Sequence, residues 1–86
     1  MFAYVYMIRS ESGRLYVGST IDIKKRFASH RHGNTQTTRN MKNIVLVFQQ
    51  EYPSLLAARR IERRLKKLKR KDYLEKIIKE GYIKIK

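Results

Sequence analysis

Five side chains of this sequence, far apart along the chain, are the parts needed to hydrolyse a phosphodiester with one metal ion. A guanidinium can bind two oxygens of a phosphate, and a carboxylate can hold a hard cation. An imidazole can accept a proton from the attacking water, and a phenol can orient that water or act as its general base. The candidates are Tyr6, Tyr16, Arg26, His30 and Glu62.

The first four candidates also have ordinary structural explanations. Tyr6 and Tyr16 could be a cross-strand aromatic pair with hydrated hydroxyl groups. Arg26 and His30 share one helix face at i, i+4 spacing, but each could be a plain surface residue. Gly18 either admits the close approach of a ligand to the backbone or relieves the end of a strand. The order of these residues along the chain, more than any one of them, favours a catalytic site.

Glu62 is the one acid between Glu51 and Asp72, in a stretch that is otherwise strongly basic. It falls at the margin of the apolar stripe of a predicted helix, not on the outer face. There it could hold one hard cation through one oxygen, with water and substrate phosphate as the other ligands, as magnesium is usually held. The alternative is an ion pair with a neighbouring arginine, worth about 0–1 kcal/mol if exposed. Position alone favours the ion pair, and the residues upstream reverse that order.

The net charge predicts a polyanionic partner. The chain has 86 residues, with 21 Lys and Arg against 7 Asp and Glu, for a formal net charge of +14. So large an imbalance destabilises the compact state, and nucleic acid is the commonest polyanion that relieves it. A basic surface that serves only solubility is the alternative.

Much of this charge lies on one predicted helix. Like-charged pairs at i, i+4, such as Arg59 with Arg63, each cost roughly 0.2–0.5 kcal/mol. A helix optimised only for stability would alternate signs, so we expect a phosphate backbone to run along this face, with a solvated basic helix as the alternative. The predicted contacts on this helix are Arg59, Arg63 and Lys66.

Length and composition exclude several classes of protein. The length predicts one domain over residues 1–86, with the motifs within 2–68 and a C-terminal helix and tail over 71–86. The sequence has no cysteine, which excludes disulfides, thiolate zinc sites and cysteine nucleophiles. No stretch approaches the roughly 18 apolar residues of a membrane span, and the N-terminus lacks the pattern of a secretory signal. We therefore expect a cytoplasmic protein without a membrane partner, with association with the nucleoid as a further option.

The chemistry requires both tyrosines on one face of a hairpin. Residues 2–9 and 15–19 have strand composition and are separated by turn residues. If the loop is the three residues 11–13, Gly13 takes the left-handed position and Ser10 pairs with Arg14. Tyr6 and Tyr16 then emerge on the same face, whereas a two-residue loop would place them on opposite faces.

The next elements present the basic candidates. Thr20 or Asp22 can cap a helix that runs to about residue 32, and a polar loop over 35–42 is expected close to the site. Residues 44–48 are continuously apolar and suit a strand buried on both faces, extended through residue 52.

The C-terminal half is predicted to be helical. A helix from 55 to about 70 carries one apolar stripe, formed by Ala57, Ala58, Ile61, Leu65 and Leu68. Asp72 opens a last helix that Gly81 closes, with three residues facing inward, Leu74, Ile77 and Ile78. The tail over 82–86 is expected to be an edge strand or frayed.

These residues resemble the motifs of the GIY-YIG nuclease superfamily, in particular its small stand-alone bacterial members. The family's Gly-Ile-Tyr looks like Tyr4-Val5-Tyr6, and its Tyr-Ile-Gly looks like Tyr16-Val17-Gly18, with nine residues between Tyr6 and Tyr16. The family's helix arginine, helix histidine and metal-binding glutamate fall on Arg26, His30 and Glu62. Two positions depart from the pattern: Tyr4 replaces the first glycine, and Ser19 stands where some members have a lysine that would help to bind phosphate.

The resemblance implies an α+β fold, with a three-stranded antiparallel sheet flanked by helices. It also implies one divalent ion per site, magnesium or manganese, bound by Glu62, and attack by water on a DNA phosphodiester. In that mechanism Tyr6 and Tyr16 position or deprotonate the water, Arg26 stabilises charge on the phosphate, and His30 assists proton transfer.

The resemblance extends to the partners. Gly18, Asn34 and Arg39 are expected near the nucleic acid, which is DNA rather than RNA, in repair or turnover. Well-defined members carry an extra DNA-binding domain that this sequence lacks, so specificity would come from a protein partner, from nucleic-acid structure, or not exist. We expect a monomer. The alternatives are a non-catalytic DNA-, RNA- or ribosome-binding module on the same scaffold and, in third place, a basic peripheral membrane protein.

Overall fold

A computed structural model describes the chain over residues 2–31, 43–68 and 70–84. Its three strands form one antiparallel sheet in the order β2-β1-β3, with β1 at Ala3–Arg9, β2 at Leu15–Thr20 and β3 at Val45–Tyr52. The helices are α1 at Ile23–Arg31, α2 at Leu55–Leu68 and α3 at Lys71–Glu80.

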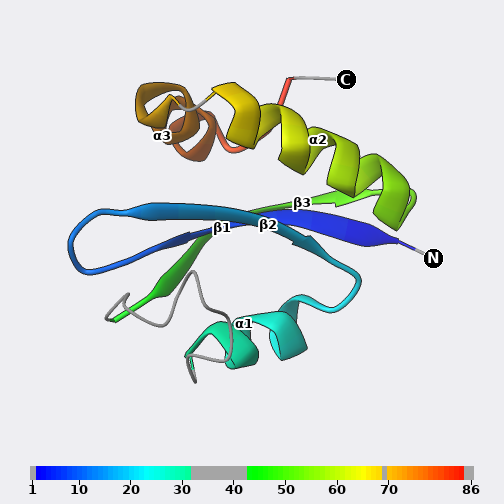
Figure 1. The fold of residues 1–86 in the computed structure, drawn as a ribbon, viewed down its shortest axis with the longest axis horizontal. Coiled ribbons are helices and arrows are strands. Elements are labelled where there is room, and N and C mark those ends of the chain that lie inside the picture. The colour runs from blue at the N-terminus through cyan, green and yellow to red at the C-terminus, as the bar shows by residue number, and fades with distance from the viewer. Residues whose placement is uncertain (1, 32–42, 69, 85–86) are drawn as a thin grey trace.

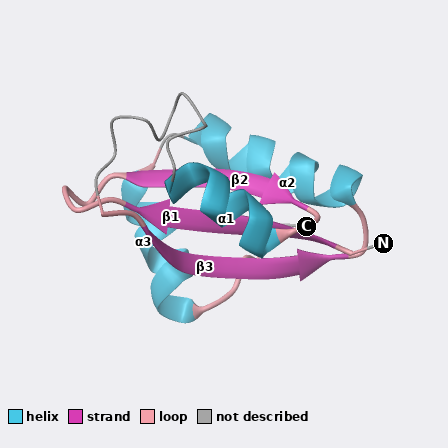
Figure 2. Cartoon of the chain, turned by 90° about the horizontal axis from the view of Figure 1, so that it is seen from below, coloured by secondary structure: helices cyan, strands magenta, loops and turns pink. Residues whose placement is uncertain are grey.

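The helices flank the sheet on both sides. α2 and α3 cover one face, and α1 lies across the other (Figures 1 and 2). The predicted α+β class, a three-stranded antiparallel sheet with flanking helices, is therefore confirmed. β1 lies at the centre of the sheet, and β2 is the edge strand that both α1 and α2 can reach.

The β1–β2 hairpin has the three-residue loop, which is the alternative that a site with two tyrosines requires. The backbone N–H of Ser10 donates to the carbonyl of Arg14 at 2.9 Å, and Gly13 has a φ of 88°. This φ lies in the left-handed region that glycine adopts without steric cost. The loop sets a register in which Ile8 pairs with Tyr16 and Tyr6 pairs with Gly18. Because side chains alternate between faces, Tyr6 and Tyr16 share one face, as the three-residue loop requires.

Side-chain oxygens begin two of the helices. The Asp22 carboxylate accepts the backbone N–H of Lys25 at 3.0 Å, which caps α1 as predicted. The Ser54 hydroxyl accepts the backbone N–H of Ala57 at 3.1 Å at the start of α2. α3 begins one residue before the predicted Asp72, after an extended Arg70, and ends at Gly81 with φ 87° as predicted.

The core lies between the sheet and α2, with α3 and the tail at its margin. Alternate residues of β1 meet one stripe of α2, and the buried cluster includes Ala3, Val5, Met7, Ala58, Ile61, Leu65 and Ile77. Ile83 is also buried, and its backbone N–H donates to the side-chain oxygen of Gln50 at 2.6 Å. Residues 82–84 are thus neither a strand nor frayed. No helix of the described chain combines the length and apolar character needed to cross a membrane.

Two burial predictions were wrong. Residues 44–48 were expected to be buried on both faces, but β3 is an edge strand, and Val45 is 57% exposed. An edge strand is covered only where helices reach it, and among the described residues of β3 only Phe48 is buried. Leu68 was expected in the apolar stripe, but it is the last residue of α2 and is 45% exposed.

Candidate active site

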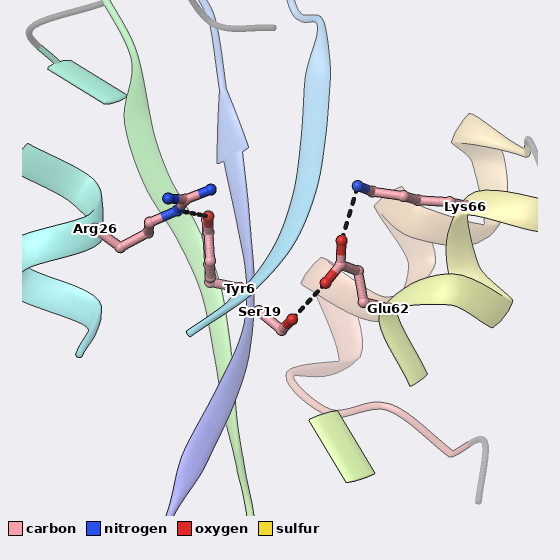
Figure 3. Close-up of polar contacts among 5 residues, drawn as sticks. All are labelled: Tyr6, Ser19, Arg26, Glu62 and Lys66. Carbon is pink, nitrogen blue, oxygen red and sulfur yellow. Dashed lines mark hydrogen bonds and ion pairs between the residues drawn. The ribbon is translucent and has the colours of Figure 1, made fainter. Parts of the chain in front are cut away.

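Tyr6 is a buried phenol on the face of the sheet that α1 covers. Its residue is 2% exposed, and its hydroxyl accepts a hydrogen bond from Nε of Arg26 at 3.3 Å (Figure 3). The ring lies over Gly18, its partner in β2. A Cβ at position 18 would fall 2.5 Å from Cζ of Tyr6 and closer still to its hydroxyl oxygen. Gly18 therefore makes room for this phenol, and its predicted contact with nucleic acid stays a prediction.

Tyr16 lies on the edge strand between the two helical layers. Its ring centroid is 6.4 Å from that of Tyr6, at an interplanar angle of 45°. On its other side, Nζ of Lys66 lies 5.2 Å from the Tyr16 centroid, within the range of a cation–π contact. The predicted aromatic pair is present, and Tyr16 connects it to α2.

Arg26 presents a permanent positive charge at this edge from α1. Hydrogen bonding to the Tyr6 hydroxyl, followed by interactions with Tyr16, raises the pKa of Arg26 above its ordinary value. The residue is otherwise exposed, so its guanidinium can reach a ligand. A planar fork of this kind binds two oxygens of a phosphate at once.

Glu62 approaches the same edge from α2, on the opposite face of the sheet (Figure 3). Its side chain is 19% exposed, as its predicted place at the margin of the stripe requires. One carboxylate oxygen accepts a hydrogen bond from the Ser19 hydroxyl, and the other lies 2.8 Å from Nζ of Lys66. The ion-pair alternative named an arginine as the partner, whereas the ion pair in the structure is with a lysine.

The residues thus approach edge strand β2 from both sides. Contacts run from Arg26 to Tyr6, from Tyr6 to Tyr16, from Tyr16 to Lys66 and from Lys66 to Glu62. Burial raises the pKa of Tyr6 most, and the charge of Glu62 adds to the rise as the smallest of the causes. Two phenols, a guanidinium and a carboxylate are therefore gathered around one strand.

Other predicted residues are placed only in part. His30 belongs to α1, one turn after Arg26, but its side chain lies outside the described part of the structure. Asn34 and Arg39 lie entirely outside the described residues. The three residues of α2 that were predicted to contact nucleic acid are exposed. Together with Glu62 they line a hollow of about 300 Å³, and they are Arg59, Arg63 and Lys66.

Burial sets the protonation state of Tyr6. Desolvation raises the pKa of Tyr6 to about 12, although the hydrogen bond from Arg26 opposes this rise. A general base works best when its pKa lies near the operating pH. The Tyr6 phenol is therefore neutral at neutral pH and is not suited to remove a proton there.

This protonation state can be measured by ultraviolet titration of the phenols. The folded protein holds the Tyr6 proton to a pKa of about 12, against 10.0 for an ordinary tyrosine. The resulting stabilisation is complete below about pH 10 and is lost as the pH rises through about 12. Tyr6→Phe should remove a late-titrating absorbance component and flatten the fall in unfolding free energy across this range. Tyr82→Phe is the control, because Tyr82 is exposed. An unchanged late component in Tyr6→Phe would contradict the assignment.

Two residues of the site were not recognised for the contacts that they make. Ser19 stood out in the sequence only as a departure from the family pattern, yet its hydroxyl holds the Glu62 carboxylate. Strand alternation places Ser19 on the α2 face with Val17, so the signal was available, but its match to position 62 depends on how α2 lies on the sheet. Lys66 was predicted to contact nucleic acid, and its i, i+4 spacing from Glu62 was the signal for their ion pair.

The candidate ligand for a metal ion among the described side chains is the single carboxylate of Glu62. Among the described residues, no group of three or more His, Cys, Asp or Glu side chains could hold a metal ion together. Magnesium is commonly bound through one or two carboxylates, with water and substrate phosphate completing its shell. A single carboxylate held by the Ser19 hydroxyl and facing a hollow is compatible with that mode.

Comparison with known proteins defines the class. The model of the GIY-YIG catalytic domain matches residues 2–78, and the chain belongs to this family. The family suggests a nuclease. One relative is a UPF0213 protein of Cronobacter sakazakii, which is 36% identical over 80% of this chain and 74% of the relative. Another is a UPF0213 protein of Staphylococcus haemolyticus, which is 32% identical over 86% of this chain and 92% of the relative. The solution NMR structure of a UPF0213 protein from Bacillus halodurans is similar, with a TM-score of 0.59 and 30% identity, over 94% of this chain and 87% of that one.

Proposed function

We propose that this protein is a metal-dependent endonuclease that hydrolyses DNA phosphodiester bonds, in repair or turnover. The observation that carries the proposal is the approach of Arg26 with Tyr6 and of Glu62 to edge strand β2 from opposite faces of the sheet. Membership of the GIY-YIG family supports it. A phosphate at this edge would meet a cation on one side and a carboxylate on the other.

We assign each side chain a role in this reaction. The exposed Arg26 guanidinium binds two phosphate oxygens and stabilises the charge that develops on them. Neutral Tyr6, held by Arg26, and Tyr16 orient the attacking water. His30, one turn after Arg26, assists proton transfer.

Glu62 would hold the divalent ion, magnesium or manganese. A bound ion of this kind supplies Lewis-acid stabilisation to the phosphate and activates water. The Ser19 hydroxyl fixes the carboxylate so that its second oxygen faces Lys66 and the open hollow. Lys66 would yield that oxygen to the ion and turn its ammonium toward the phosphate.

The exposed cations of α2 provide the path for the nucleic acid. Arg59 and Arg63 border the same hollow as Glu62, so a strand that contacts them passes the carboxylate. Phosphates bound along this face would neutralise part of the net charge of +14 and relieve its self-repulsion.

The test is the nicking of supercoiled plasmid by purified protein. The expected result is open-circular product with magnesium or manganese and none with a chelator. Activity should decline steeply with salt, since each phosphate contact contributes about −0.9 to the slope of log affinity against log salt for duplex DNA. Activity that persists in the chelator would contradict the metal requirement.

A non-catalytic nucleic-acid-binding module is the second candidate, and one observation favours it. Both oxygens of Glu62 already have partners, Ser19 and Lys66, as in an ordinary structural ion pair. This reading expects salt-sensitive binding of DNA or RNA, no cleavage under any metal, and affinity that does not change in Glu62→Ala.

A further inference from the structure

A second hollow adjoins the candidate active site. It has a volume of about 600 Å³ and is lined by the end of the β1–β2 hairpin, β2, the end of α2 and the start of α3. Figures 1 and 2 show α3 near the same end of the sheet as the hairpin turn. The volume falls within the roughly 300–1,000 Å³ that is usual for small-molecule sites.

The lining of this cavity combines an apolar surface with positive charge. Leu15 and Leu74 provide partly exposed apolar side chains, and the charged lining residues are Arg14, Lys66, Arg70 and Lys71, with no acid among the lining residues. A surface that binds only the phosphate backbone requires cations and does not require apolar side chains. A cavity that has both apolar side chains and cations in its lining is complementary to a molecule with a flat apolar part and a phosphate.

Two of the four cations have charge available for a ligand. Lys66 is paired with Glu62, and Arg70 with Asp72 at 2.8 Å. Arg14 and Lys71 are exposed, and neither takes part in an ion pair with another described residue. We therefore expect the phosphate to bind at Arg14 and Lys71.

The cavity and the candidate active site share two residues, Tyr16 and Lys66. A nucleotide in the cavity would therefore be a close neighbour of a phosphate at Glu62 and Arg26. A paired base cannot enter such a hollow, because its faces are stacked and its edge is occupied in the duplex. An unpaired base enters without the unstacking and unpairing cost.

We propose that this cavity binds one unpaired nucleotide that flanks the phosphate to be cut, with its base on the leucines and its phosphate on Arg14 and Lys71. The inference rests on the proposed function and gives its substrate class: nucleic acid with an extrahelical or frayed nucleotide. Such a site would provide selectivity for structure within this chain.

The test is a binding measurement in the presence of a chelator, so that it does not depend on cleavage. The probes are a fully paired duplex and the same duplex with one bulged 2-aminopurine nucleotide. The expected result is about tenfold tighter binding of the bulged duplex, which corresponds to about 1.4 kcal/mol. The 2-aminopurine emission should also change on binding as the base enters the cavity.

Two double variants each remove two positive charges, one pair from the lining of the cavity and the other pair from α3 outside it. In Arg14→Gln/Lys71→Gln the preference for the bulge should fall to about twofold or less, and the salt slope should drop by about 1 for each lost phosphate contact. Lys76→Gln/Lys79→Gln removes two exposed cations of α3 that do not line the cavity, and it should keep the preference. Circular dichroism confirms that both variants are folded.

Three results would overturn the inference. They are equal affinity of the native protein for both duplexes, equal loss of preference in both double variants, and displacement of the bulged duplex by micromolar AMP, which would assign the cavity to a free mononucleotide. Nicking without any bulge preference would uphold the nuclease and refute this subsite. A preference for the bulge that depends on the cavity, without any nicking, would uphold this subsite and refute the nuclease.

Discussion

Glu62→Gln is expected to reduce metal-dependent nicking at least about a hundredfold while the protein stays folded. The substitution keeps the shape of the side chain and its hydrogen bond from Ser19, but it removes the charge that would hold the cation. Loss of Lewis-acid stabilisation of several kcal/mol gives an effect of this order. The measurement is the initial rate of plasmid nicking at saturating magnesium.

Glu80→Gln is the matched control for this prediction. Like Glu62, Glu80 is a helical glutamate paired with a lysine four residues on, Lys84 at 3.4 Å, but it lies on α3. The control removes the same charge and the same type of ion pair, so its nicking rate should stay within about twofold of the native rate, as for surface changes away from a site. A Glu62→Gln protein that nicks at the native rate would contradict the role of the carboxylate in holding the cation.

Gly18→Ala is expected both to destabilise the protein and to abolish most of its activity. The added Cβ would meet the Tyr6 ring at 2.5 Å from Cζ, so a buried phenol in the central strand must move. Overpacking of this kind typically costs about 1–3 kcal/mol. The displaced hydroxyl would also lose its hydrogen bond from Arg26. Urea unfolding and the nicking assay measure the two effects.

Gly81→Ala is the control that distinguishes an effect on stability from an effect on the candidate active site. Gly81 has a φ of 87°, and nothing lies within 4 Å of a Cβ there, so only backbone strain of about 1–2 kcal/mol is added. This control should therefore lose stability and retain nicking at temperatures where it stays folded. A Gly18→Ala protein as stable and active as the native one would show that Tyr6 is not held as the structure shows.

Sequence reasoning predicted the parts of the fold that local chemistry decides. The three-residue loop with Gly13 determined the register of the hairpin, and with it the common face of Tyr6 and Tyr16. The interval of buried positions in α2 placed Glu62 at the margin of the core. Each of these depends on a turn type or on helical periodicity, both of which act within a few residues.

Features that depend on contacts between helices and strands could not be predicted from local sequence patterns. The apolar run in β3 indicates a strand, but only the strand order β2-β1-β3 shows that it is an edge strand. The hydrogen bond from Ser19 to Glu62 spans 43 positions and requires α2 to lie over β2. The arrangement of the candidate site around two faces of one strand follows from the same packing, and neither periodicity nor spacing indicates it.

This two-sided arrangement has a consequence for catalysis. Residues on one face of a sheet can be assembled by a single hairpin and its helix, as Tyr6 and Arg26 are here. Glu62 belongs to the other layer, so a phosphate that contacts both groups would have to lie at the edge of β2. If both groups act on one phosphate, the loss of either should disable the same step.

The most direct test of this claim is a double-mutant cycle in single-turnover nicking, with Arg26→Gln, Glu62→Gln and their combination. Effects of residues that act as a unit are strongly non-additive. We predict that each single variant loses at least about a hundredfold and that the double variant is no slower than the slower single variant. Losses that multiply in the double variant, or a single variant with the native rate, would show that the guanidinium and the carboxylate do not work on one phosphate.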